Sequence, residues 1–558
     1  MPISKKVPRI IGNLTLFIGL FIVVSNVSRK FHGPRQLIDT YFLVYLNSAA
    51  FATVLFTGVV LILLSSPLKK RKRRGWHVAI SILIINMIFE FFRFHVHFTQ
   101  IALSAFLLLI LIIFRAEFYA KSDPSTRYAP LKTFFFASTI FTFLGILLFY
   151  FRLRDNILGD YSFQDVLGTV LSGLVWQSGN IELKSRLLQD TLQVTLGAFG
   201  IFILLIPMWS YFRKVSSISH SSTEEKLEIK SLIKTFGDDD SLAYFATRDD
   251  KSLIWSSNRK AGIAYRVENG VMIASGDPFG EYSIWPDAIS NFVAKAEEFA
   301  WSIAVLGASE IGGKAWIDNA GMSAIEIGDE AIIDVKDFSL EGRSMSNLRQ
   351  TLNKANRRNL HCEVKLVSQL SAREIDLIRA RGKEWRGDNA ERGFSMGMDR
   401  FMGEIDGENL LVQCFYENEL VGFLHFVPWG KVGYSLDRMQ RSGLHLPGIT
   451  ELMIEKTILY CVENRYRYIS LNFAAFRSVI ERAEKISAGP LLRATRSVIR
   501  VTSGWFQIES LYRFNAKFQP SWKPRYLLYS GATELVPVVW GALKAEKFLN
   551  GFKQRSLS

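Results

Sequence analysis

The chain of 558 residues is poor in the residue types that carry metal and disulfide chemistry, with three cysteines and eight histidines. Cys362, Cys414 and Cys461 are far apart and odd in number, which argues against a disulfide framework and indicates a reducing compartment for that part of the chain. No two histidines have the spacing of a metalloprotease helix. These shortages predict neither a metal site nor a disulfide-stabilised fold.

Two catalytic motifs are present only in part. Residues Gly393–Gly397 match the hydrolase pattern G-x-S-x-G, but the polar residues 386–392 before them cannot form the buried strand that this motif needs. Residues Gly307–Lys314 have the wrong glycine spacing for a P-loop, and Ala315 stands where Ser or Thr would hold magnesium. We therefore expect no nucleotide cofactor, no metal and no hydrolase triad.

Positive charge and apolar residues are abundant. The formal net charge is +15, 49% of residues are hydrophobic, and the mean hydropathy is +0.15. This hydropathy is high for a purely soluble protein and low for one buried entirely in a membrane, so a mixed architecture is predicted. The excess of cations favours anionic partners such as nucleic acid or lipid headgroups.

All long apolar runs lie in the first 212 residues. Six of them, at about 10–27, 41–65, 77–92, 100–114, 133–151 and 190–212, predict membrane spans. Basic residues follow the second span as the run Lys69–Arg74, the fourth between residues 115 and 132, and the sixth as Arg213 and Lys214. The positive-inside rule places these segments, both termini and the soluble half in the cytoplasm.

The pattern changes after a Ser-rich stretch. We predict a transmembrane domain at 1–214, a linker at 215–224, a first α/β unit at 225–343, a basic connecting helix at 344–359, and a second α/β unit carrying the catalytic site at 360–558. Both units contain antiparallel strand patterns, then a helix, then another strand. Predicted elements include a hairpin turning at 268–270, strands at 410–416, 420–428, 432–439 and 468–473, and a helix at 450–464.

Two basic segments leave two interpretations open. In the helix at 344–359, Arg349, Lys354, Arg357 and Arg358 could follow a phosphate backbone or simply face water. The segment Leu511–Tyr526 interleaves four cations with five aromatic rings, which suits an anionic, partly planar ligand. Its rings could instead pack inward while its cations are solvated.

Two further segments carry candidate site residues. Asp437 is expected at a strand terminus, ahead of a helix carrying Glu451, so the two carboxylates could act as base and orienter. Alternatively, Asp437 forms a structural salt bridge with Arg438 or Arg441. The segment Trp385–Phe401 mixes rings with cations and is typical of a ligand-facing loop.

Six motifs in order resemble the phosphatidylglycerol lysyltransferase family, the synthase halves of the multiple peptide resistance factors. They are GDPFG (276–280), WRGDNAERGFSM (385–396), SLDRM (435–439), PGITELM (447–453), SLNFA (470–474) and LYRFNAKFQPSWKPRY (511–526). The resemblance implies tandem GNAT-like folds joined by the basic helix, in a bacterial cell membrane. It also implies transfer of an aminoacyl group from aminoacyl-tRNA to a hydroxyl of phosphatidylglycerol, which lowers membrane negative charge and gives resistance to cationic antimicrobial peptides.

On this resemblance we hypothesise roles for individual residues. The expected catalytic residues are Asp437, Arg438, Arg441, Glu451 and Lys517. Those expected to hold tRNA or phosphate are Arg349, Lys354, Arg357, Arg358, Arg513, Trp522 and Arg525. The expected substrate pocket comprises Asp277, Trp385, Arg392, Phe394, Ser395 and Asn472. One position departs from the family pattern, because Gln440 stands where relatives often have an arginine.

Other functions remain open at this stage. A membrane-tethered acyltransferase that uses acyl-CoA would need a pyrophosphate-binding turn, which residues 440–445 match only in part. The third hypothesis is a non-catalytic protein, anchored in the membrane, that binds tRNA or lipid. Lysine is the favoured amino acid, with alanine and arginine as alternatives, and assembly into a homo-oligomer is left open.

Overall fold

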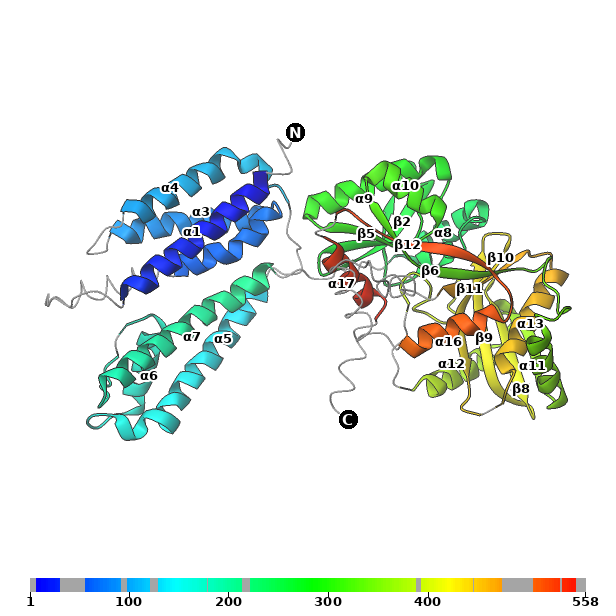
Figure 1. Cartoon of the computed structure of the whole chain (residues 1–558). Coiled ribbons are helices and arrows are strands. Elements are labelled where there is room, and N and C mark those ends of the chain that lie inside the picture. The colour runs from blue at the N-terminus through cyan, green and yellow to red at the C-terminus, as the bar shows by residue number, and fades with distance from the viewer. Residues whose placement is uncertain are drawn as a thin grey trace. The chain divides into compact units, whose positions relative to one another are not determined.

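The computed structural model separates into two compact units, one of apolar helices and one built on a β-sheet (Figure 1). The first comprises residues 1–215 and the second most of the remaining chain. This boundary falls beside the predicted end of the membrane domain at residue 214. The structure describes residues 7–30, 56–91, 98–120, 129–177, 179–212, 221–387, 393–444, 446–473, 505–531 and 534–547.

The helices of the first unit form two apolar cores. One contains α1 (Val7–Lys30), the helix Phe56–Lys69, α3 (Arg73–Phe91) and α4 (Phe98–Ile113). The other contains α5 (Ala129–Leu148), α6 (Phe163–Leu174) and α7 (Arg186–Phe212). A Cβ atom on Gly19 would lie 2.8 Å from the carbonyl oxygen of Gly58. Small residues that allow such close backbone approach are typical of packing between membrane helices.

Three described helices are long and apolar enough to cross a membrane, over Val7–Ser25, Leu131–Phe151 and Leu188–Met208. They correspond to the first, fifth and sixth predicted spans. The remaining predicted spans fall on shorter or less apolar helices, and residues 41–55 of the second lie outside the described residues. The full count of six spans stays a prediction.

The described strands of the second unit form one twelve-stranded sheet in the order β1-β2-β3-β5-β12-β6-β11-β10-β9-β8-β7, with β4 paired to β2. The strands are β1 (Ser252–Trp255), β2 (Ala261–Glu268), β3 (Val271–Ser275), β4 (Phe279–Gly280), β5 (Ser302–Ala308), β6 (Ser323–Asp334), β7 (His361–Leu366), β8 (Leu410–Tyr416), β9 (Glu419–Trp429), β10 (Gly433–Arg441), β11 (Tyr468–Phe473) and β12 (Ser521–Tyr529). The helices are α8 (Thr223–Phe236), α9 (Trp285–Phe299), α10 (Glu310–Ala320), α11 (Ser346–Arg357), α12 (Ala372–Arg386), α13 (Ile449–Glu463), α16 (Trp505–Ala516) and α17 (Leu535–Ala545).

The sheet contains the predicted repeat. In the first half, antiparallel strands lead through α9 to β5, which pairs in parallel with β3. In the second half, antiparallel strands lead through α13 to β11, which pairs in parallel with β10. This recurrence confirms the two related α/β units predicted from the pattern, and it agrees with the tandem GNAT-like folds that the family resemblance implies.

The two halves exchange strands at the middle of the sheet. Strand β6, from the first half of the sequence, pairs with β11 of the second half. Strand β12, from the end of the chain, pairs with β5 of the first half, and β6 and β12 pair with each other (Figure 1). The units predicted at 225–343 and 360–558 therefore share one sheet, because residues 521–529 complete the first half.

Local predictions agree with the observed elements. The hairpin joins β2 to β3 through Asn269 and Gly270, which have positive φ angles of 50° and 72°. The basic helix is α11, which buries Leu348, Leu352 and Ala355 against the core. The aromatic and basic segment at 511–526 is divided between α16 and β12, a break that its composition did not reveal.

Candidate active site

Asp437 lies at a bulge in β10, where the register against β9 shifts. Its side chain is only 1% exposed. One carboxylate oxygen accepts a hydrogen bond from the backbone N–H of Met398 at 2.6 Å, and the other lies 2.7 Å from Nδ1 of His425. Nε2 of the same imidazole lies 3.3 Å from Nδ2 of Asn409. The Asp437 carboxylate thus joins His425 of β9 to the loop that contains Met398.

Arg438 completes this centre. Its Nε lies 3.3 Å from Oδ2 of Asp437, which establishes the salt bridge foreseen as one alternative. Nη2 donates to the carbonyl oxygens of Met398 and Arg400 at 3.1 and 3.2 Å, and the guanidinium lies 4.9 Å from the ring centroid of Phe401. A base that already accepts from several donors is better placed to hold its neighbours than to remove a proton. Catalysis by Asp437 remains a prediction.

The parallel strands β10 and β11 part beyond the pair Ser435 and Ser470. Asn472, with φ of 67°, lies where they separate. Its Nδ2 donates to the carbonyl oxygens of Leu436 at 2.6 Å and Met396 at 2.9 Å. Asn472 therefore joins the strand ends to the loop 393–402, which also contacts Asp437.

The same loop is anchored from the C-terminal side of the chain. Oε2 of Glu546 accepts from the backbone N–H of Phe394 at 2.8 Å, and Oε1 accepts from the hydroxyl of Ser395 at 2.7 Å. Phe394 is 0% exposed and Ser395 is 1% exposed. Phe394 and Ser395, both predicted in the substrate pocket, therefore face the interior, and the Ser395 hydroxyl donates to Glu546.

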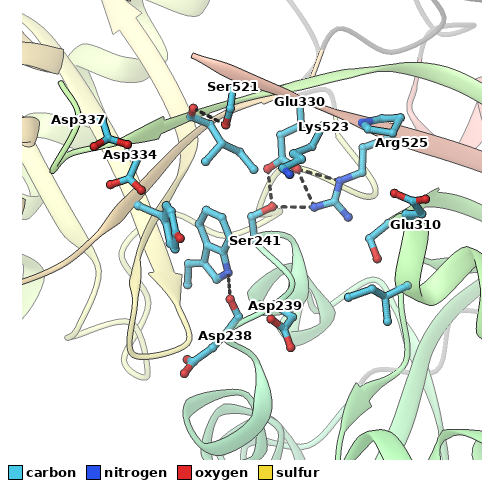
Figure 2. Close-up of a pocket in the computed structure, with 16 residues that line it drawn as sticks. Asp238, Asp239, Ser241, Glu310, Glu330, Asp334, Asp337, Ser521, Lys523 and Arg525 are labelled. Atoms are coloured by element: carbon cyan, nitrogen blue, oxygen red, sulfur yellow. Dashed lines mark hydrogen bonds and ion pairs between the residues drawn. The ribbon is translucent and has the colours of Figure 1, made fainter. Parts of the chain in front are cut away.

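A central cavity of about 470 Å³ opens where the two halves of the sheet meet (Figure 2). Its walls come from the loop before η5 (Ala243–Thr247), the start of α10, the paired strands β6 and β12, and the ends of β9 and β11. Figure 2 shows carboxylates on several sides of this space. Its lining carboxylates are Asp238, Asp239, Glu310, Glu330, Asp334 and Asp337, and its lining cations are Lys523 and Arg525.

Arg525 is committed to carboxylates within the protein. Its guanidinium lies 2.7 Å from Glu330, and its Nη2 donates to the hydroxyl of Ser241 at 2.7 Å (Figure 2). The guanidinium also lies 3.0 Å from Asp240. Burial opposes the charge, but Glu330 and Asp240 raise the pKa of Arg525 above its ordinary value. The sequence predicted that Arg525 holds an external phosphate. The structure corrects this prediction, because the guanidinium is buried and paired with Glu330 and Asp240.

Buried carboxyl groups adjoin this network. Burial, reinforced by the nearby charge of Asp240, raises the pKa of Asp277 to about 7. Asp277 accepts from the backbone N–H of Ser309 at 2.9 Å, at the start of α10. Burial likewise raises the pKa of Asp240. Asp277 was predicted in the substrate pocket, but it does not line the central cavity.

The cavity has an excess of negative charge. Of its six carboxylates, Glu330 is paired with Arg525 and Asp334 with Arg467. The other four lining carboxylates, Asp238, Asp239, Glu310 and Asp337, are accompanied by one further lining cation, Lys523. Trp429 and Tyr468 add stacked rings to the wall, with centroids 5.5 Å apart. Such a lining disfavours an anion and suits an organic ammonium group, which gains from both carboxylates and aromatic faces. No group of metal-ligating side chains occurs among the described residues.

The predicted phosphate-binding residues differ in exposure and in the contacts they make. On α11 and its C-terminal cap, Lys354, Arg357 and Arg358 are exposed, while Arg349 donates to the carbonyl oxygen of Gly342 at 2.8 Å. Arg513 is exposed on α16. Trp522 stacks on Tyr512 with ring centroids 4.4 Å apart, so one face of the indole is occupied.

Two predicted catalytic residues, Lys517 and Glu451, form an ion pair with each other. Lys517 donates to Glu451 at 2.8 Å, which links the end of α16 to the first turn of α13. Arg441 is exposed at the end of β10. Trp385 packs against Phe423 with ring centroids 6.0 Å apart. Arg392 lies outside the described residues.

Sequence reasoning missed several residues of these networks: His425, Asn409, Glu330, Asp240 and Glu546. Strand β9 gives one usable signal, because His425 interrupts a continuous run of buried apolar residues. Glu330 is likewise a carboxylate within the buried part of β6. Glu546 follows the apolar helix α17, where nothing nearby in the sequence points to its partners.

These features define a class: a protein with apolar, membrane-type helices and a tandem GNAT-like unit that contains an acidic cavity. Residues 230–529 match the family model described as "Phosphatidylglycerol lysyltransferase, C-terminal", and residues 3–212 match "Transmembrane region of lysyl-tRNA synthetase". The chain belongs to the phosphatidylglycerol lysyltransferase family. It is associated with the membrane through its apolar helices.

The relatives that this chain matches are longer than the chain. The chain is 35% identical over 560 residues to the "Lysylphosphatidylglycerol biosynthesis bifunctional protein LysX" of Rhodococcus jostii (strain RHA1), covering 98% of this chain and 49% of that protein. The protein of the same name from Nocardia farcinica (strain IFM 10152) is 32% identical over 558 residues, with 98% and 48% covered. This chain thus spans about half the length of these relatives. The solved structure of L-PGS from Bacillus licheniformis is 21% identical, with a TM-score of 0.48, and the match covers 59% of this chain and 98% of that chain.

Proposed function

We propose that this chain transfers the lysyl group of lysyl-tRNA to a hydroxyl of phosphatidylglycerol at the cytoplasmic face of the bacterial membrane. The acidic central cavity is the observation that carries this proposal. A lysyl ester has two ammonium groups, and a wall with six carboxylates and two cations complements them. The names of the relatives and of the family favour lysyl over arginyl.

The reaction needs no ATP, because the aminoacyl ester is already activated. The lipid hydroxyl oxygen attacks the ester carbonyl carbon to give a tetrahedral intermediate. The bond to the terminal ribose oxygen of the tRNA then breaks, and the proton lost by the lipid hydroxyl ends on that ribose oxygen. One ester replaces another, so the protein must mainly orient two large anionic substrates and stabilise the oxyanion.

Different groups of described residues bind the donor and position the reacting groups. The central cavity holds the ammonium groups of the donor. Asp437, fixed by His425, orients the loop 393–402 and keeps Arg438 in place. The exposed cations of α11 meet the phosphate backbone of the tRNA, as Lys354, Arg357 and Arg358 face solvent.

Use of acyl-CoA is less well supported. Gln440 and Arg441, which would begin the pyrophosphate-binding turn, still belong to β10, where they pair with Phe423 and Gly422. The first two positions of that turn therefore lie in a strand in this structure.

The experiment that tests this function supplies the purified full chain, in lipid nanodiscs containing phosphatidylglycerol, with lysyl-tRNA labelled on lysine. We expect label to appear in the lipid, and we expect RNase pretreatment to abolish its appearance. Transfer from acyl-CoA, or no transfer from any aminoacyl-tRNA, would contradict the proposal. Mass spectrometry of the lipid identifies the amino acid and the acceptor.

A further inference from the structure

A second cavity lies beside the acidic central cavity, and its lining carries the opposite net charge. Its volume is about 260 Å³, and it is lined by Lys230, Lys234 and Lys431 together with Tyr244, Tyr434 and Tyr466. We call it the lysine–tyrosine pocket. Its lining includes one carboxylate, Glu408. Three ammonium groups against one carboxylate leave it net positive, whereas the neighbouring cavity is net negative.

The two cavities are separated by one tight turn. Trp429 lines the acidic cavity, while Gly430 and Lys431, which follow it, line the lysine–tyrosine pocket. Asp238 fixes the turn, because its carbonyl accepts from Nε1 of Trp429 at 2.9 Å and its carboxylate accepts from the backbone N–H of Lys431 at 2.8 Å. Gly430 has φ of 51°, and a Cβ atom there would lie 2.2 Å from that carboxylate. The wall between the cavities thus has a defined shape.

The pocket combines an aromatic floor with a cationic rim. Tyr244 and Tyr434 are buried, and Tyr466 packs edge-on against Tyr434 with ring centroids 4.9 Å apart. Lys431 is exposed, and the Lys234 side chain is 60% exposed. Lys234 pairs with Glu408 at 2.8 Å, an exposed contact that an incoming phosphate can replace at low cost.

We infer that the lysine–tyrosine pocket binds the 3′-terminal nucleotides of the aminoacyl-tRNA, so that the aminoacyl ester passes the Trp429 turn into the acidic cavity. The lysines would neutralise the terminal phosphates, and the half-buried ring of Tyr466 would contact the terminal base or ribose. The opposite charges of adjacent cavities match the opposite charges of a polyanionic RNA end and its cationic lysyl group. This inference rests on the proposed function, and it identifies where the donor enters.

RNA is favoured over the anionic membrane surface as the occupant. A membrane surface is contacted by exposed cations and rings on a protruding face. Here the lysines surround a recess, and a recess suits the inserted end of a nucleotide chain better than a flat membrane surface. A lipid headgroup at this site is the competing outcome of the test.

The test measures binding of deacylated tRNA to the full chain in nanodiscs across a range of salt concentrations, which requires no catalysis. Lys234→Ala/Lys431→Ala is compared with Lys314→Ala/Lys383→Ala, a pair of exposed lysines outside the pocket. We expect the pocket variant to bind at least tenfold more weakly, with the slope of log Kd against log salt reduced by about 1.4, or about 0.7 for each lysine. The control pair should leave both quantities unchanged.

A second variant tests whether the aromatic ring of Tyr466 contributes to binding. Tyr466→Leu keeps an apolar contact with Tyr434 but removes the aromatic face. It should reduce by about tenfold the preference for a tRNA minihelix that ends in its terminal adenosine over one that lacks it. Unchanged tRNA binding and salt slope in the lysine variant would overturn the inference, as would loss of binding to phosphatidylglycerol vesicles with tRNA binding intact. If tRNA binds here but no lysine is transferred, the proposed function fails and this inference stands.

Discussion

Arg525 and Glu330 form a buried ion pair across the two central strands of the sheet, with Nη2 2.7 Å from the carboxylate. Arg525 belongs to β12 and Glu330 to β6, the strands that the two halves exchange. Glu330 is 0% exposed and also accepts from the hydroxyls of Ser241 and Ser470. This pair therefore ties together four segments that are distant in the sequence, and it forms one wall of the acidic cavity.

Glu330→Gln should destabilise the second unit by about 3 kcal/mol, because it leaves Arg525 buried with less compensating charge. The measurement is urea unfolding followed by tryptophan fluorescence. Arg467→Gln is the matched control, since it removes an ion pair in which Arg467 is 52% exposed and lies 3.0 Å from Asp334. The control should change stability by less than about 1 kcal/mol. Equal effects of the two substitutions would contradict the account.

Much of this architecture was predictable, because it depends on local patterns. Strand β8 at 410–416, strand β11 at 468–473, the hairpin at 268–270 and the apolar face of α11 all follow from periodicity and turn residues. The pair Arg525 and Glu330 was not predictable, since it depends on strand exchange between segments 195 residues apart. The composition of the segment containing Arg525 is basic and aromatic, which does not indicate whether the arginine is exposed. Arg525 is buried because β12 lies in the middle of the sheet, between β5 and β6.

The position of Asp437 was predicted only approximately. A carboxylate before a loop and helix was expected to end its strand, but β10 continues to Arg441 and places Asp437 at an internal bulge. Its salt bridge with Arg438 was foreseen as an alternative, whereas its contact with His425 was not. The contact with Met398 also depends on a loop whose path the sequence does not specify.

Asp437→Ala should lower lysyl transfer at least about 100-fold, because it frees the loop 393–402 at Met398. Asp437→Asn should retain more activity, since its amide oxygen can still accept from the Met398 N–H. The assay is initial transfer of label from lysyl-tRNA to lipid, with kcat and KM measured separately. Wild-type transfer by Asp437→Ala would refute any role for this residue. Equal loss in both variants would show that Asp437 acts as a base.

Ser395→Ala should leave transfer within about threefold of wild type. The Ser395 hydroxyl is buried and donates to Glu546 at 2.7 Å, so the substitution removes one internal hydrogen bond and costs about 1 kcal/mol of stability. Complete loss of transfer in a variant with an unchanged unfolding midpoint would instead indicate a nucleophilic serine.

The pKa of about 7 for Asp277 predicts a pH dependence of stability. Because an unfolded aspartate has a pKa of about 3.9, the folded protein binds this proton more tightly. The contribution is fully present below about pH 4 and is lost as pH rises through about 7. Asp277→Asn should remove this loss, so wild type should weaken relative to the variant between pH 5 and 7.5. Parallel stability curves for the two proteins over that range would contradict the assignment.

The most direct test of the central claim, that the acidic cavity recognises a cationic aminoacyl group, is competition between lysyl-tRNA and alanyl-tRNA as donors to phosphatidylglycerol. Asp239→Asn/Glu310→Gln neutralises two exposed cavity residues, and Asp318→Asn changes an exposed carboxylate on α10 outside the cavity. We expect the double variant to lower the lysyl-to-alanyl ratio of kcat/KM at least tenfold, mainly through the lysyl donor, and we expect Asp318→Asn to leave the ratio unchanged. An unchanged ratio in the double variant would contradict the account.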